Sequence, residues 1–188
     1  IRLAEKMQQK YILIKKPVLD SLCKKRYPLG RQSTRALCEA TFGTREVLDM
    51  AILVSGGAGY IGSHTCIELL NAGYDVVVAD NYYNASPVVL DRVKQITGKD
   101  FRFYQADMTK HEDVEKIFTE CPDIDAVIQF AAYKAVGESV SKPIEYYYNN
   151  LNCTLVILDV MRRHNCRNFV FSSSATVYGD PASVPITE

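Results

Sequence analysis

Residues 50–188 show blocks of apolar and polar positions that predict strands and helices in turn. Short apolar runs between polar or turn residues are typical of buried strands, and apolar residues three or four positions apart are typical of amphipathic helices. The predicted strands cover 51–55, 75–79, 101–105, 125–130 and 168–172. The predicted helices cover about 61–71, 87–96, 109–121 and 143–165, with a capping box at 109–112 and a loop at 131–141.

This alternation predicts an α/β protein, because strands that alternate with helices through short connections form parallel sheets with right-handed crossovers. The expected fold class is a Rossmann-type doubly wound parallel sheet, truncated after the fifth strand. Ligands of such sheets bind beyond the carboxyl ends of the strands. The helix predicted at 143–165 is apolar nearly all round, so we expect it to need covering on more than one side.

A glycine-rich loop, Gly56-Gly-Ala-Gly-Tyr-Ile-Gly62, joins the first predicted strand to the first helix. In dinucleotide-binding proteins the first glycine permits a tight turn, the second lets the backbone approach a pyrophosphate, and the third allows close packing of the helix. The helix N-terminus adds N–H groups and a positive dipole end. With a strand before it and a helix after it, the loop predicts a dinucleotide site rather than a plain turn.

Asp80 follows Gly62 by eighteen residues and ends the second predicted strand. A carboxylate at this place can accept hydrogen bonds from both ribose hydroxyls of the nucleotide, and it would repel a 2′-phosphate. The next residue is Asn81 and not Arg. The sequence therefore predicts NAD, rather than NADP, as the cofactor.

Charge divides the chain into two parts, although the net charge of the 188 residues is zero. Residues 1–49 hold eleven Lys and Arg against five Asp and Glu, and residues 50–188 hold eleven against seventeen. We interpret 1–49 as a basic extension of unassigned role, either disordered or upstream sequence before a natural start at Met50. A nucleic-acid arm or targeting peptide is the alternative, but the five acids and the missing apolar core speak against targeting peptides.

The remaining composition excludes several classes of site. The six cysteines form no C-x-x-C pair, which favours reduced, mostly buried thiols in a cytosolic protein. The three histidines are scattered, so we expect no metal site. Because apolar runs stay well below twenty residues, we expect no membrane span.

Four stretches carry a family resemblance: 56–65, 134–139, 147–150 and 171–180. Through them residues 50–188 resemble the first part of the UDP-glucose 4-epimerases, which are extended short-chain dehydrogenase/reductases. The stretch 134–139 is the discriminating one, since sugar-nucleotide dehydratases of the same fold usually carry a different loop there. The resemblance covers about three-quarters of the chain, and residues 1–49 match nothing in it.

The resemblance implies an isomerase of galactose metabolism that is cytoplasmic, uses NAD, acts on a UDP-sugar and is a homodimer at full length, without nucleic acid, membrane or metal. It implies that Ser174 is the catalytic serine and binds the sugar hydroxyl of the substrate. The implied cofactor-binding residues are Gly56, Gly59, Tyr60, Ile61, Gly62, Asp80, Asn81, Tyr82, Tyr83, Asn84, Ala85, Asp107, Met108, Phe130, Ala131, Ala132, Tyr133, Lys134 and Asn149.

The chain also departs from the family pattern. The family's catalytic Tyr-x-x-x-Lys lies beyond Ser174 and is not reached before Glu188, and the sugar-binding C-terminal domain is absent too. We therefore expect an epimerase portion that is inactive as given, with an exposed apolar patch on the helix at 143–165. The alternatives are a non-catalytic NAD-binding module or incomplete gene product, and another sugar-nucleotide epimerase or dehydratase. Smaller departures are Ser55 for Thr, Gln129 for His, Ala132-Tyr133 for Gly-Leu and Cys153 for Gly.

Overall fold

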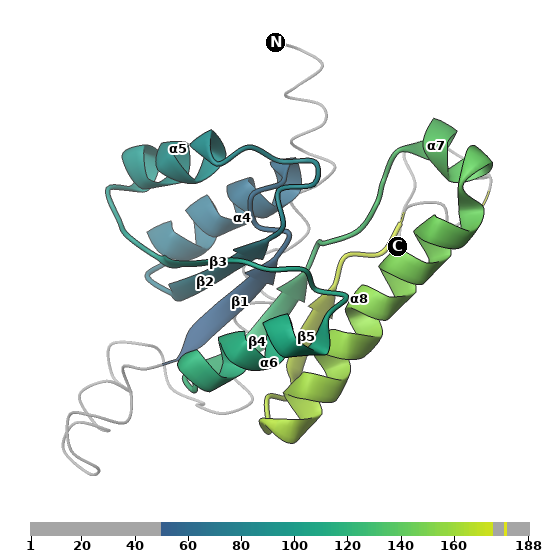
Figure 1. The fold of residues 1–188 in the computed structure, drawn as a ribbon. Helices are drawn as coiled ribbons and strands as arrows, with labels where there is room; N and C mark the ends of the chain where they lie inside the picture. The colour runs from purple at the N-terminus through teal and green to yellow at the C-terminus, as the bar shows by residue number, and fades with distance from the viewer. Residues whose placement is uncertain (1–49, 175–178, 180–188) are drawn as a thin grey trace, which may run out of the picture.

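The computed structural model describes residues 50–174 and residue 179. The predictions for residues 1–49, and for 175–178 and 180–188, lie outside the described residues. All paired strands run parallel, in the order β3-β2-β1-β4-β5 (Figure 1). The strands are β1 (Ala51–Ser55), β2 (Asp75–Asp80), β3 (Arg102–Gln105), β4 (Ile124–Gln129) and β5 (Asn168–Phe171). The predicted Rossmann-type parallel sheet is confirmed.

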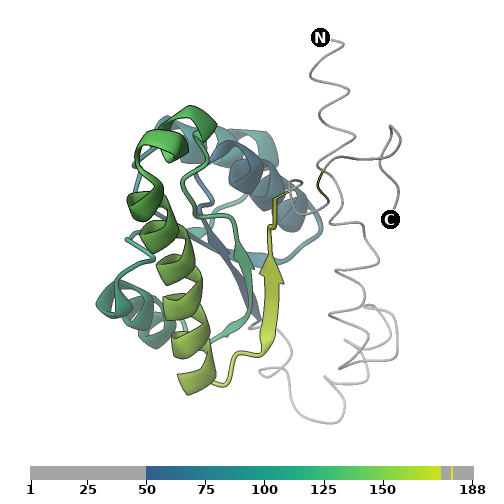
Figure 2. The same cartoon turned by 90° about the vertical axis from the view of Figure 1, so that its right-hand side faces the viewer.

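Helices cover the sheet on both faces. The pair α4 and α5 lies on one face, and the pair α6 and α8 lies on the other (Figures 1 and 2). The bounds are α4 (Tyr60–Asn71), α5 (Val88–Thr97), α6 (His111–Glu120), α7 (Val136–Ser141) and α8 (Pro143–Arg163). Gly98 ends α5 in the left-handed conformation, with φ of 63°, as the sequence predicts for a helix C-terminus.

The core follows from the alternation of side chains along each strand. Leu53, Val77 and Val127 point to the face of α6 and α8, where they pack into one buried cluster. Their neighbours Val54 and Val78 belong to a second cluster, under α4 and α5. The central strands are therefore buried on both faces, which explains why they read as continuous apolar runs.

Two local predictions are wrong. The segment predicted as a loop at 131–141 contains the short helix α7, which Ser139 and Lys142 stabilise through hydrogen bonds to Val136 and Glu138. The predicted capping box at 109–112 does not form. Instead α6 begins with Lys110 at its N-cap, and the Thr109 hydroxyl donates to the Asp107 carboxylate over 2.7 Å.

Cysteines 66, 121, 153 and 166 are free thiols with buried side chains, as the sequence predicts. Burial raises the pKa of Cys66 and of Cys153 to about 12, so both thiols stay protonated near neutral pH. Within the described residues no helix has the length and apolar character to span a membrane. In the same part of the chain, no cluster of His, Cys, Asp or Glu side chains is arranged to hold a metal ion.

The strand order creates an opening at one edge of the sheet. After β1 the chain builds β2 and β3 on one side, and then crosses to place β4 on the other side of β1. The connections that leave β1 and β4 therefore diverge, and such a switch point is where ligands bind in doubly wound folds.

Candidate functional site

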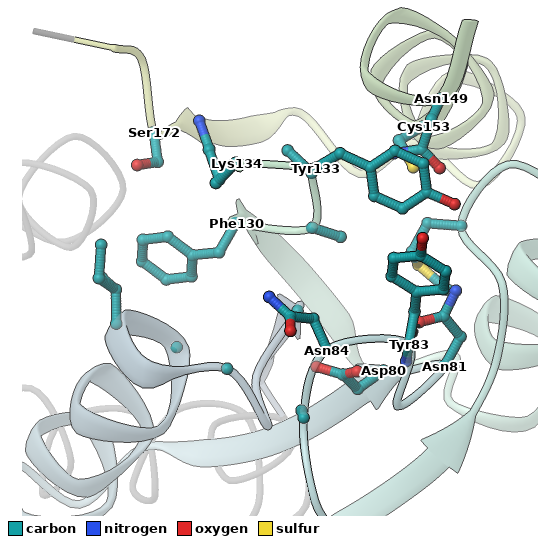
Figure 3. A pocket seen from close by; sticks show the side chains of 18 of the residues that line it. Asp80, Asn81, Tyr83, Asn84, Phe130, Tyr133, Lys134, Asn149, Cys153 and Ser172 are labelled. Atoms are coloured by element: carbon teal, nitrogen blue, oxygen red, sulfur yellow. Dashed lines mark hydrogen bonds between the residues drawn. The ribbon is translucent and has the colours of Figure 1, made fainter. Parts of the chain in front are cut away.

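A cavity of about 660 Å³ lies at this edge, between the connections that follow β1, β2, β3 and β4 (Figure 3). Its lining includes every residue that the resemblance implies for the cofactor, except Tyr82. These lining residues are Gly56, Gly59, Tyr60, Ile61, Gly62, Asp80, Asn81, Tyr83, Asn84, Ala85, Asp107, Met108, Phe130, Ala131, Ala132, Tyr133, Lys134 and Asn149.

Two residues implied for the site do not line this cavity. Tyr82 has a left-handed backbone, with φ of 60°, and its ring packs on Phe103 with centroids 5.2 Å apart. Ser174 is exposed, and among the described residues after β5 it is Ser172 that lines the cavity. Ser172 ends the strand predicted at 168–172, and so lies at the edge where ligands are expected. The sequence reasoning missed the lining residues Ala106, Ala135, Glu138, Tyr146 and Cys153.

Main-chain atoms leave no room for a Cβ at two positions of the glycine loop. Gly56 has φ of +75°, and a Cβ there would lie 2.6 Å from the Ala131 nitrogen. A Cβ on Gly62 would lie 2.2 Å from the Gly56 carbonyl oxygen. The close approach at Gly62 is therefore to the loop itself, and not to the sheet as the sequence pattern suggested. Side chains at either position would force the loop open.

The N-terminus of α4 faces the cavity through this loop. Gly59 is its N-cap, and the first turn carries no acidic side chain. The amides of the first helical residues, Tyr60 to Gly62, have no acceptor four residues earlier, as at every helix start. Both these amides and the positive end of the helix dipole suit a phosphate group. The glycine loop and the start of α4 thus fit the pyrophosphate of a dinucleotide.

Asp80 is buried at the end of β2, with 9 % of its surface exposed. Its Oδ2 accepts a hydrogen bond from the Ala58 amide over 3.0 Å, and its Oδ1 accepts one from the Tyr82 amide over 2.9 Å. The carboxylate therefore holds the glycine loop against β2, in addition to facing the cavity. Sequence spacing alone gave no sign of this second role.

Asn150 on α8 is a positioning residue that the sequence reasoning did not single out. Its Oδ1 accepts from the Tyr133 amide over 2.7 Å, and its Nδ2 donates to the Tyr133 carbonyl over 3.1 Å. Asn149 donates to the same Oδ1 over 3.0 Å. The pair of bonds fixes the connection after β4 to α8, seventeen residues away. Its signal in the sequence is its place in the stretch 147–150, which carries the family resemblance.

Three tyrosines form one wall of the cavity. The Tyr133 ring lies between those of Tyr83 and Tyr146, with centroid distances of 4.7 Å and 5.3 Å. Burial raises the pKa of Tyr133 above its ordinary value, and the neighbouring Tyr83 adds to the effect. Burial, and then the hydrogen bond to Glu138, raise the pKa of Tyr146 as well. Tyr133 and Tyr146 are therefore suited to binding and not to acting as bases at neutral pH.

Comparison with known proteins places this chain in a protein family. Residues 52–188 match the NAD dependent epimerase/dehydratase family. The chain belongs to this family. The match covers β2 to β5, all of β1 except Ala51, and the whole cavity lining.

Curated relatives and solved structures agree with the match. UDP-glucose 4-epimerase of Bacillus subtilis is 58% identical over 139 residues, and that of Haemophilus influenzae is 61% identical over 139 residues. Both alignments cover 74% of this chain and 41% of the relative. The structure of UDP-glucose 4-epimerase from Bifidobacterium longum, in complex with NAD+ and UDP, superposes with a TM-score of 0.70 at 59% identity, covering 74% of this chain and 41% of that one.

The chain thus spans about 41% of the length of the curated relatives it matches. The matched part contains the sheet, the glycine loop and the cavity. The similarity therefore covers the part of the chain that forms the cavity, and the roles of the individual cavity residues are proposals.

Proposed function

We propose that this chain is the NAD-binding portion of a UDP-glucose 4-epimerase, which interconverts UDP-glucose and UDP-galactose. The observation that carries the proposal is Asp80, which is buried at the end of β2 and followed by Asn81. A carboxylate at this place can accept hydrogen bonds from ribose hydroxyls and disfavours a 2′-phosphate. The family match and the relatives above support the same assignment.

On this proposal the cavity holds the dinucleotide along the edge of the sheet. The amides at the start of α4 would bind the pyrophosphate, and Asp80 with Asn81 would bind the adenosine ribose. Asp107 and Met108 would flank the adenine. Phe130, Ala131, Ala132 and Lys134 would line the opposite end, where Ser172 also lies (Figure 3).

Bound NAD would supply the hydride acceptor for oxidation at C4 of the sugar, and return the hydride to the other face. This chain's contribution is to bind and orient the cofactor and, through Ser174, to hydrogen-bond the 4-hydroxyl of the sugar. A general base must take the hydroxyl proton. Tyr133 and Tyr146 are poor candidates because their pKa values are raised. The proposed base is therefore the tyrosine of the family's Tyr-x-x-x-Lys motif.

We further propose that the outer face of α8 is covered by protein in the active enzyme, including a second copy in a homodimer. Leu151 and Leu155 on this face are 59% and 63% exposed, and several aromatic side chains lie beside them. Apolar groups gathered on one helix face are typical of an interaction surface. The buried free thiols of the described residues support a cytoplasmic location.

Cofactor choice is the first test. Isothermal calorimetry with NAD and with NADP on the 188-residue chain should give tighter binding of NAD. Equal affinities would contradict the role of Asp80 in selecting the cofactor. Absence of binding to either dinucleotide would contradict the whole assignment.

Activity requires a second test that supplies the remaining groups. Residues 50–188 would replace the matching 139 residues of the Bacillus subtilis relative, and the chimaera would be assayed for conversion of UDP-galactose to UDP-glucose. We expect turnover, with Ser174→Ala lowering kcat by at least about a hundredfold, the scale of lost proton-transfer assistance. Ser173→Ala is the matched control. A folded, NAD-loaded chimaera without turnover would refute the epimerase proposal and leave NAD binding standing.

A further inference from the structure

An aromatic contact joins the two sides of the cavity. Tyr83 comes from the connection between β2 and α5, and Tyr133 comes from the connection between β4 and α7. Their ring centroids are 4.7 Å apart, with the planes inclined by 32°. Because β2 and β4 lie on opposite sides of β1, this contact crosses the opening at the switch point.

The contact closes one end of the cavity only. The two rings lie at the end where Asn81 and Cys153 are found, and Lys134 and Ser172 lie at the other end (Figure 3). On the function proposed above, the closed end is where the adenosine half of the dinucleotide would lie. The other end would stay accessible to a sugar nucleotide.

The main chain of each tyrosine is held by an asparagine side chain. The Tyr83 amide donates to Asn81 Oδ1 over 2.9 Å, which fixes the start of its loop. Asn150 holds both main-chain groups of Tyr133 from α8. Rings on fixed backbones lose little further freedom when they meet, so the contact is preorganised.

A third ring supports Tyr133 from behind. Tyr146 meets it edge-on, with centroids 5.3 Å apart and planes inclined by 60°. The Tyr146 hydroxyl donates to Glu138 over 2.7 Å, and Lys142 pairs with the same carboxylate over 2.9 Å. Because Tyr146 holds the Tyr133 ring in place, Tyr83 is the ring that can move outward, and 61% of its surface is exposed.

We propose that Tyr83 and Tyr133 form a clasp across the adenosine end of the cavity, and that this clasp sets the residence time of the bound dinucleotide. The proposal rests on NAD binding as proposed above. The rings contact each other at the end of the cavity where Asn81 and Cys153 lie, so a nucleotide lying between the two connections leaves from this end only after they separate. The energy of the ring contact is then added to the barrier for release.

The test measures dissociation and needs no turnover. The 188-residue protein is loaded with NADH, and its fluorescence is followed in a stopped-flow instrument after mixing with excess NAD. We expect Tyr83→Leu and Tyr133→Leu each to raise the dissociation rate by about two- to tenfold, the scale of one aromatic pair.

The double variant identifies the contact itself. Since either single substitution already removes the ring pair, Tyr83→Leu with Tyr133→Leu should dissociate no faster than the faster single variant. Multiplied effects would show that the tyrosines act separately and would overturn the clasp. Ile96→Ala, a substitution of an exposed apolar residue of α5 outside the cavity lining, is the control and should leave the rate unchanged.

The remaining outcomes are equally decisive. Wild-type dissociation rates in both leucine variants would overturn the clasp while leaving NAD binding intact. A wild-type protein that binds no NADH would overturn both the clasp and the proposed function. Tyr83 is mostly exposed, so its variant remains a valid test if Tyr133→Leu does not fold.

Discussion

Asp80 offers the sharpest test of the site, because the structure gives its carboxylate two tasks at once. It faces the cavity, and it accepts hydrogen bonds from the amides of Ala58 and Tyr82. Replacing it with alanine should therefore weaken both the fold and the binding of dinucleotide. A residue that only contacted ribose would change binding alone.

The size of each effect follows from burial. Ala58 is 2% exposed, so its amide would stay dry and unpaired in Asp80→Ala, which costs about 1–3 kcal/mol of unfolding free energy. The Tyr82 amide lies in a more open turn, where water can replace the carboxylate. Loss of ribose hydrogen bonds to a charged acceptor should raise the Kd for NADH by about tenfold to a hundredfold.

The assay pairs urea unfolding with NADH titration on the same protein. Asp75→Ala is the matched control, because it removes the same side chain from the exposed amino end of the same strand. We expect the control to bind like the wild type and to unfold within about 0.5 kcal/mol of it. An Asp80→Ala protein with wild-type stability and weakened binding would refute the loop-holding role. Lowered stability with unchanged affinity would refute the ribose role.

Other predictions test the loop, an ion pair and a surface. Gly62→Ala places a methyl group 2.2 Å from the Gly56 carbonyl, so calorimetry should show NAD binding weakened at least about tenfold; retained affinity would contradict the tight loop. A bidentate hydrogen bond from Arg102 lowers the pKa of Asp123. Urea unfolding should therefore show wild type more stable than Asp123→Asn by about 1 kcal/mol or less. This difference should be complete above pH 4, and it should vanish as the pH falls through the pKa of Asp123 in the folded protein, which is the lower of its two values. Leu155→Lys should reduce self-association in sedimentation without lowering the unfolding midpoint, and unchanged sedimentation would argue against an interface there.

Most of the architecture could be predicted because it rests on local patterns. The strands at 51–55, 75–80 and 125–129 are apolar on both faces, and this directly reflects a sheet covered on both sides. The glycine loop was predictable because only glycine fits at Gly56 and Gly62, where a Cβ would clash with main-chain atoms, so the requirement is visible in the sequence. The rule that ligands bind at the carboxyl ends of strands gave the edge of the sheet where the cavity lies, and the family resemblance gave most of its lining residues.

What escaped prediction depends on hydrogen bonds that no apolar periodicity marks. Asn150 reaches Tyr133 across seventeen residues, and no periodicity marks such a bond. The helix α7 carries Gly137 and places Val136 and Val140 largely in water, so it has no apolar face to predict it. Thr109 fits the sequence pattern of a capping box, but its hydroxyl donates a hydrogen bond to the Asp107 carboxylate instead. The role of Asn150 thus depends on a tertiary contact, whereas α7 and the start of α6 depend on local hydrogen bonds of single polar side chains.

The helix α8 links the proposed nucleotide site to the exposed apolar surface. Asn149 and Asn150 hold the cavity side, and Leu151, the next residue, points into water on the outer face. Protein that covers this outer face would fix the position of α8, and with it the main chain of Tyr133. Binding equilibria at two sites that share one element are coupled reciprocally. Association through α8 should therefore tighten dinucleotide binding, and bound dinucleotide should favour association to the same extent.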